Sequence, residues 1–208
     1  MNKNISNEII ARLRILIPNP ECELNFNNNF ELVCAVMLSA QTTDKRVNMV
    51  TPNLFNKYPT PALMKNANLD EVKDIIKSVG LANNKAKSLI SLAKTIDENY
   101  KGVVPNSIEE LIKLPGVGRK TASVVLAVGF KIPAMPVDTH LHRVAKRLGY
   151  IKDSDDVLVA EERYKKYIKK EDWIDAHHLL LLFGRYYCKA QNPECDDCPL
   201  KEFCKKKK

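Results

Sequence analysis

Apolar residues recur every three or four positions along most of this chain, the spacing that forms one face of an α-helix. Ile5, Ile9 and Leu13 begin the pattern near the N-terminus. No stretch of useful length alternates apolar and polar residues as a half-buried strand does. Glycine supplies only 7 of the 208 residues, about half the usual share, which disfavours a β-sandwich or barrel with many tight turns. The sequence therefore predicts an all-α fold of about ten helices.

Capping residues and prolines predict where several helices begin and end. Pro52 is expected to split or kink the helix that begins near Asp44. Asn68 is expected to open a helix that Gly80 closes. Longer helices are predicted over residues 84–99, 139–148, 155–169 and 173–186.

Charge and composition exclude several classes of protein. The chain has 33 Lys and Arg against 25 Asp and Glu, a net charge of +8. This basic balance is compatible with nucleic acid but does not identify it. Hydrophobic residues make up 45% of the chain, enough for a core. No apolar run approaches the ~18 residues of a membrane span, and the N-terminus does not resemble a secretory signal. We expect a soluble cytoplasmic protein.

A glycine-containing turn stands between two short predicted helices, in the segment LPGVGRKTA at residues 114–122. Pro115 ends the first helix, and Gly116 and Gly118 are expected to allow positive φ and to expose backbone N–H groups. The second helix begins at once, so its free N–H groups could hold a phosphate. The spacing is not that of a nucleotide P-loop. An ordinary helical hairpin remains an equally good interpretation of the segment alone.

Four of the six cysteines fall within the last 21 residues, with the spacing C-x6-C-x2-C-x5-C: Cys188, Cys195, Cys198 and Cys204. In a reducing compartment, clustered cysteines more often bind metal than form disulfides. Structural zinc usually has two paired knuckles and this segment has one, yet zinc and an iron–sulfur cluster both stay open on spacing alone. Cys22 and Cys34 are interpreted as small buried hydrophobic residues.

An aspartate and a histidine stand where another helix is expected to begin, in the segment PVDTH at residues 136–140. Asp138 is a good N-cap, and the helix dipole would keep its carboxylate ionised. His140 and His142 are two positions apart and face different directions, so they are not expected to share a metal. His140 is instead expected to bond a phosphate or to pack beside the site. His177 and His178 are expected to be structural.

Taken together, LPGVGRKTA, VDTHLHRVAKRLG and the four C-terminal cysteines resemble the endonuclease III family of helix-hairpin-helix DNA glycosylases. The similarity runs from residue 23 to Cys204. It implies two helical lobes with a DNA-binding cleft between them. One domain would be a six-helix barrel over residues 22–132, with the hairpin at about 107–128; the other would be a discontinuous iron–sulfur domain over residues 1–21 plus 133–208.

The resemblance implies that Lys120 and Asp138 are catalytic. A neutral amine can attack C1′ of the sugar and form a Schiff base, after which elimination of the 3′ phosphate nicks the strand. The lysine pKa must fall for this, and partial burial, Arg119 and the helix N-terminus would all lower it. Asp138 would activate the lysine or a water and stabilise positive charge on the sugar.

The resemblance also implies DNA contacts. Gln41 would bond the orphaned partner base, and Leu81 would act as an apolar wedge. By itself Leu81 is typical of a hydrophobic contact after a helix end. The other residues expected to contact DNA are Gly116, Gly118, Arg119, Thr121 and His140.

The predicted function is base excision repair. The protein would remove oxidised or ring-damaged pyrimidines from duplex DNA, cleave the abasic site by β-elimination, bind a [4Fe–4S] cluster through the four C-terminal cysteines, and act as a monomer at the bacterial nucleoid. One alternative is a mismatch glycosylase without lyase activity. Adenine-specific relatives generally lack the lysine and carry a further C-terminal domain, so Lys120 and the chain end at Lys208 argue against it. The other alternative is a non-catalytic DNA-binding module, which has no need of Lys120 and Asp138.

Overall fold

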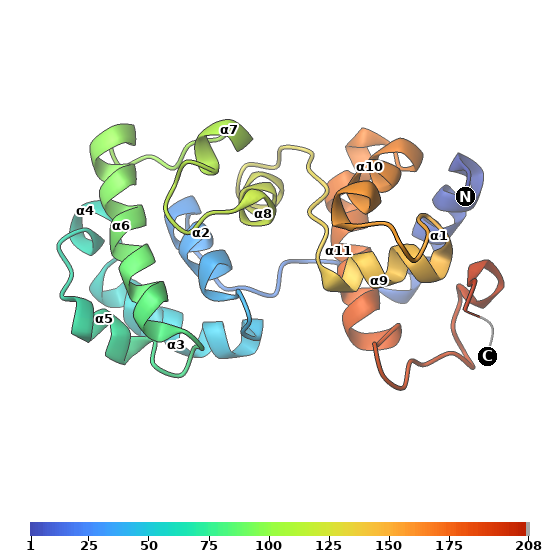
Figure 1. Cartoon of the computed structure of the whole chain (residues 1–208), viewed down its shortest axis with the longest axis horizontal. Helices are drawn as coiled ribbons and strands as arrows, with labels where there is room; N and C mark the ends of the chain where they lie inside the picture. Colours follow the sequence, from blue (N-terminus) through green and yellow to red (C-terminus); the bar gives the residue numbers. More distant parts are fainter. Residues whose placement is uncertain (207–208) are drawn as a thin grey trace. The chain divides into compact units, whose positions relative to one another are not determined.

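The computed structural model describes residues 1–206, and within them the chain is helical with no strand (Figure 1). This confirms the predicted all-α class; the described residues form eleven α-helices, against the expected ten or so. No described helix has the length and apolar character needed to cross a membrane. The last two positions of the domain predicted over 133–208 lie outside the described residues.

The backbone divides into two compact units, one formed by Cys22–Ile132 and the other by Met1–Glu21 together with Pro133–Lys208. The chain therefore leaves the second unit after its first helix and returns to it after the whole of the first unit has been completed. Each unit has its own core and is described separately.

The unit Cys22–Ile132 is built around one buried helix. Every residue of α2 from Phe30 to Leu38 is buried, as expected for a segment that is apolar except at Glu31. It packs against α8, α3 and α6, and α6 packs in turn against α4 and α5 (Figure 1). The helices of this unit are α2 (Asn29–Leu38), α3 (Asp44–Lys57), α4 (Pro61–Met64), α5 (Leu69–Ile75), α6 (Ala82–Tyr100), α7 (Ile108–Leu111) and α8 (Arg119–Gly129).

The discontinuous unit packs its N-terminal helix against helices from the other end of the chain. Its helices are α1 (Lys3–Leu16), α9 (Thr139–Leu148), α10 (Val157–Tyr167) and α11 (Trp173–Leu182), with a π-helical turn at Phe183–Tyr187 and 3-10 turns at Lys170–Asp172 and Lys201–Phe203. α1 contacts both α10 and α11. Two buried hydroxyl contacts join distant segments: Tyr164 donates to the carbonyl of Leu141 at 2.9 Å, and Ser6 shares a hydrogen bond with Tyr150 at 2.7 Å.

Two predicted helix ends are wrong. α3 is continuous from Asp44 to Lys57, so of the two effects expected of Pro52, a split or a kink, the split is wrong. Pro52 is exposed, and buried Val50 and Leu54 on either side hold the helix together despite the missing N–H. α5 ends at Ile75 rather than at Gly80, because buried Ile76 and Val79 turn the chain before the glycine.

The two isolated cysteines differ. Cys34 is fully buried on α2, and this burial raises the pKa of its thiol. Cys22 is only half-buried. The interpretation as a small buried hydrophobic residue is therefore confirmed for Cys34 and wrong for Cys22, which lies at the start of its unit rather than inside a helix.

Candidate active site and cysteine loop

The glycine turn joins α7 to α8 as a helical hairpin. Ser107 caps α7, with its hydroxyl accepting a hydrogen bond from the backbone N–H of Glu110 at 3.3 Å. Gly116 has φ +77°, and a Cβ there would lie 2.6 Å from Sδ of Met37 and 3.2 Å from Cβ of Ser88. A side chain here would be strained at this φ and would require the Met37 side chain to move, so glycine is favoured.

Gly118 behaves differently from the expectation. Its φ is −88°, in the extended region, and a Cβ built on it meets nothing within 4 Å, so the predicted positive φ is wrong here. Gly118 is instead the N-cap of α8, and as glycine it offers no side chain to the first amides of the helix. Those amides and the positive end of the helix dipole suit an anion such as a DNA phosphate.

Lys120 is the second residue of α8, between Arg119 and Thr121. Its side chain is exposed, as is that of Arg119, while Thr121 is half-buried. The partial burial expected for Lys120 is therefore wrong. The structure places its amine at the start of the helix that follows the hairpin turn, where it can be reached from outside the unit.

Gln41 and Leu81 lie on neighbouring loops of the same unit. Gln41, between α2 and α3, has φ +56°, and Leu81, at the N-cap of α6, has φ +61°. A Cβ on Gly80 would lie 4.0 Å from the Gln41 carbonyl oxygen, so the two loops lie side by side. The Leu81 side chain is 60% exposed, which argues against the interpretation as an ordinary packing contact after a helix end.

Asp138 belongs to the other unit, where it caps α9. Its Oδ1 accepts hydrogen bonds from the backbone N–H groups of His140 at 2.8 Å and Leu141 at 2.9 Å, which confirms the predicted cap. The chain segment before Asp138 is also held in place, because Nδ1 of His177 bonds the Pro136 carbonyl at 2.8 Å. His177 therefore has a structural contact, as expected.

His140 and His142 have separate partners, which agrees with the expectation that they do not form a metal pair. Nδ1 of His140 shares a hydrogen bond with Arg143 at 3.2 Å, whereas Nε2 of His142 bonds the carbonyl of Asp155 at 2.8 Å. The backbone of His140 packs closely on Gly184, where a Cβ would lie 2.9 Å from Cβ of His140.

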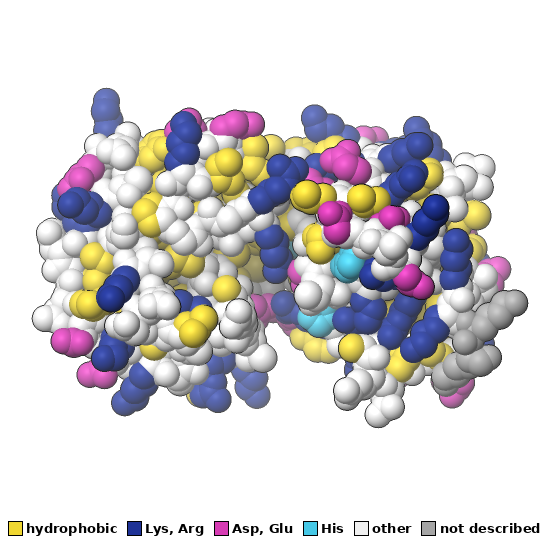
Figure 2. Space-filling model, in the orientation of Figure 1, with side chains coloured by type: hydrophobic (Ala, Val, Ile, Leu, Met, Phe, Trp, Pro, Cys, Tyr) yellow, Lys and Arg dark blue, Asp and Glu magenta, His cyan; other side chains and the backbone are white. Residues whose placement is uncertain are grey.

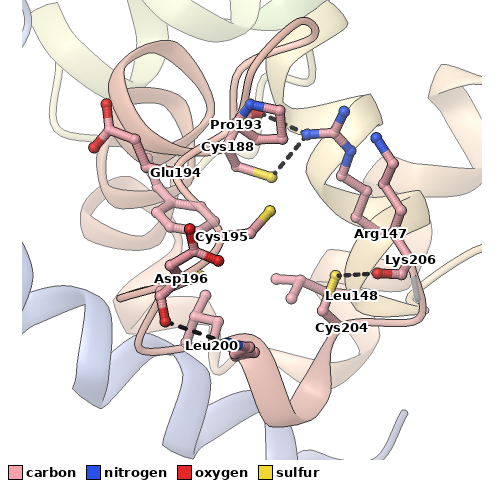
Figure 3. A pocket seen from close by; sticks show the side chains of 13 residues that line it. Arg147, Leu148, Cys188, Pro193, Glu194, Cys195, Asp196, Leu200, Cys204 and Lys206 are labelled. Atoms are coloured by element: carbon pink, nitrogen blue, oxygen red, sulfur yellow. Dashed lines mark hydrogen bonds between the residues drawn. The ribbon is translucent and has the colours of Figure 1, made fainter. Parts of the chain in front are cut away.

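The four C-terminal cysteines line one cavity of about 470 Å³ within their unit. Figure 3 shows Cys188, Cys195 and Cys204 directed toward the same space. Within residues 1–206 no three His, Cys, Asp or Glu side chains gather closely enough to hold a single metal ion. The thiol donors and the space between them fit an iron–sulfur cluster.

Two arginines of α9 hold the start of the cysteine loop, and the sequence analysis did not single them out. Arg143 donates to the carbonyls of Gly184 at 2.6 Å and Cys188 at 3.0 Å. Arg147 donates to the carbonyl of Cys188 at 3.1 Å (Figure 3) and to that of Lys189 at 2.7 Å. The sequence could have indicated this pair, because two arginines four residues apart on a helix lie on the same face.

Comparison with known families assigns the class. Residues 34–170 match the HhH-GPD superfamily of base excision DNA repair proteins, and residues 188–204 match the iron–sulfur binding domain of endonuclease III. The fold and the cysteine loop thus define a helix-hairpin-helix base excision repair protein with an iron–sulfur domain. The match over residues 188–204 decides in favour of an iron–sulfur cluster over zinc, the two alternatives that the cysteine spacing left open.

Individual relatives narrow the class. The endonuclease III of Bacillus subtilis is 52% identical over 190 residues, 91% of this chain and 87% of the relative. That of Escherichia coli K12 is 43% identical over 207 residues, 100% of this chain and 98% of the relative. A solved structure of a trapped endonuclease III–DNA covalent intermediate superposes with a TM-score of 0.95 at 46% identity, covering 99% of this chain and 96% of that one.

The chain belongs to the endonuclease III family. It is accordingly a base excision repair enzyme that combines DNA glycosylase and abasic-site lyase activities and carries a [4Fe–4S] cluster. The resemblance identified from the motifs is confirmed. A thermostable thymine-DNA glycosylase shares the fold, with a TM-score of 0.83 at 21% identity.

Proposed function

We propose that Lys120 is the nucleophile of both reactions. Its amine adds to C1′ of the damaged nucleotide, the C1′–N bond breaks, and the base leaves with a proton. Opening of the sugar ring gives a Schiff base between Nζ and C1′. Loss of a C2′ proton then breaks the C3′–O bond and releases the 3′ phosphate. The observation that carries this role is the place of Lys120 at the exposed start of α8, directly after the hairpin turn.

Asp138 is proposed as the second catalytic residue. Both amide hydrogen bonds of its cap end on Oδ1, so Oδ2 takes no part in the cap. A carboxylate held in this way cannot rotate freely, and a fixed anion stabilises the positive charge that develops on the sugar. It also offers a base of fixed position for the proton transfers.

Duplex DNA with an oxidised or ring-damaged pyrimidine, or with an abasic site, is the proposed substrate, bound by a monomer. The hairpin residues Gly116, Gly118, Arg119 and Thr121 would bind backbone phosphate, with His140 as a further contact. Gln41 and Leu81 would fill the space left by the flipped nucleotide, a step that costs a few kcal/mol in an intact duplex. The exposure of both side chains supports this role.

Cys188, Cys195, Cys198 and Cys204 are proposed as the ligands of the [4Fe–4S] cluster. When bound, the cluster cross-links the four thiolates and so fixes the loop. Lys189, beside the first ligand, pairs with Glu194 at 2.7 Å within this loop. The cluster is proposed to shape a DNA-contacting loop, and it takes no part in cleavage of the glycosidic bond.

Borohydride trapping tests the proposal directly. Borohydride reduces a Schiff base to a stable amine, so the wild-type protein should become covalently attached to duplex DNA across a panel of oxidised pyrimidines and abasic sites. Lys120→Ala should give no adduct, whereas Lys94→Ala, which removes an exposed lysine of α6, should trap as the wild type does. Base excision without any trapped adduct would instead support a glycosylase that lacks lyase activity.

A further inference from the structure

Lys85 is a buried lysine in the first turn of α6, close to the loops that carry Gln41 and Leu81. Only 7% of its surface is exposed. Its ammonium donates to the carbonyls of Leu38 at 2.9 Å and Ala40 at 2.7 Å and to the hydroxyl of Thr42 at 3.1 Å. An ammonium group has three N–H bonds, so these partners use its full donor capacity.

Burying this charge has a cost that a purely structural residue would avoid. An apolar side chain of similar length would fill the same space without desolvating an ammonium group. Burial lowers the pKa of Lys85, in keeping with that cost. The compensation comes from α2, which ends at Leu38 and directs the negative end of its dipole at the ammonium.

Two of the contacts of Lys85 lie on either side of Gln41, a residue with a strained backbone. Ala40 and Thr42 stand on either side of Gln41, whose φ of +56° is a left-handed conformation. For a residue other than glycine this conformation is strained, and it persists only where surrounding contacts fix it. The hydrogen bonds on both sides of Gln41 supply that constraint.

Lys85 also stands in the helix turn that follows Leu81. The backbone N–H of Lys85 donates to the carbonyl of Leu81 at 3.0 Å, which closes the first turn of α6 on a second residue with positive φ. The side chain of Lys85 thus joins the Gln41 loop to the first turn of α6, which begins beside Leu81.

We propose that Lys85 is a positioning residue that locks the Gln41 and Leu81 loops together as one duplex-opening element. This rests on the proposed roles of Gln41 and Leu81 in filling the space of the flipped nucleotide. Lys85 itself does not touch the reacting atoms. Its loss should therefore impair steps that require the duplex to be opened, and should spare cleavage of an abasic site that has no partner strand.

Two substrates separate these effects for Lys85→Met. Under single-turnover conditions, excision of a damaged pyrimidine from duplex DNA should fall at least about tenfold, the effect of losing hydrogen bonds to a charged group. Cleavage of an abasic site in single-stranded DNA should stay within about twofold of the wild type. A fluorescent base analogue opposite the lesion should also show a smaller unstacking signal.

Two further variants control for general destabilisation. Lys65→Met removes an ion pair with Asp97, which joins α4 to α6, and should leave both assays unchanged. Thr42→Val removes one acceptor of Lys85 without disturbing the buried charge, and should impair duplex excision in the same direction but less. The inference would be overturned if Lys85→Met and Thr42→Val lost as much activity on the single-stranded abasic site as on the damaged duplex. It would also be overturned if neither variant lost activity on either substrate.

Gln41→Ala and Leu81→Ala distinguish failure of the inference from failure of the proposed function. If these two variants impair duplex excision while Lys85→Met and Thr42→Val do not, only the role of Lys85 is wrong. If they leave duplex excision unchanged, the proposed roles of the two loops are wrong, and the inference falls with them.

Discussion

At the scale of single residues, Asp138 combines a structural and a chemical task. Its Oδ1 closes the N-terminus of α9 through two backbone amides. The sequence predicted this cap because aspartate before an amphipathic helix is a strong start signal. The catalytic role came from the family resemblance, since a cap alone explains the residue equally well.

Asp138→Asn separates the two tasks. Asparagine is as good an N-cap as aspartate, so the free energy of unfolding should change by less than about 0.5 kcal/mol. The negative charge is lost, so base excision should fall by at least about a hundredfold, the usual scale for a positioned acid–base group. Urea unfolding and single-turnover excision measure the two effects.

Asp138→Ala completes the comparison because it removes both the cap and the charge. It should cost about 1 kcal/mol of stability in addition to the loss of activity. Unchanged turnover in Asp138→Asn would reduce Asp138 to a cap.

At the scale of elements, the sequence predicted helices well where periodicity and caps agreed. The starts of α5 and α9 are set by Asn68 and Asp138, as expected. It predicted less well where packing outweighed a local signal, as with the helix that continues through Pro52. The positive φ of Gln41 and Leu81 could not be predicted, because neither residue type signals it and contacts far along the chain impose it.

The hairpin turn gives a prediction at this scale. Gly116→Ala should destabilise the protein by about 1–3 kcal/mol, because alanine is strained at φ +77° and its Cβ would overlap the Met37 side chain. Gly118→Ala is the matched control, two residues away, with φ −88° and open space around a Cβ. Its cost should stay below about 1 kcal/mol. Equal midpoints of urea unfolding for the two variants would contradict this account of the turn.

At the scale of the whole molecule, the net charge is +8, and the face shown in Figure 2 has Lys and Arg side chains on both units. The charge did not identify the function; Lys120, Asp138 and the four cysteines did, through the motifs around them. With the family known, the contribution of this charge to DNA binding can be measured.

Affinity for duplex DNA should fall as salt rises, because each neutralised phosphate releases counterions. Fluorescence anisotropy over a range of salt concentrations gives the slope of log affinity against log salt. Arg119→Ala should reduce that slope by about 1 if the hairpin binds a phosphate, whereas Lys94→Ala should leave it unchanged. If the affinity of the wild type for DNA did not change with salt, the protein would not bind DNA through its phosphates.

The interrupted unit also has a consequence for synthesis on the ribosome. Helix α1 emerges before its packing partners α10 and α11, which lie more than a hundred residues further along the chain. The intervening unit, Cys22–Ile132, is contiguous and has a complete core of its own, so it can fold as soon as it emerges. The apolar face of α1 must meanwhile remain uncovered. The core of the discontinuous unit can therefore be completed only after α10 and α11 have left the ribosome.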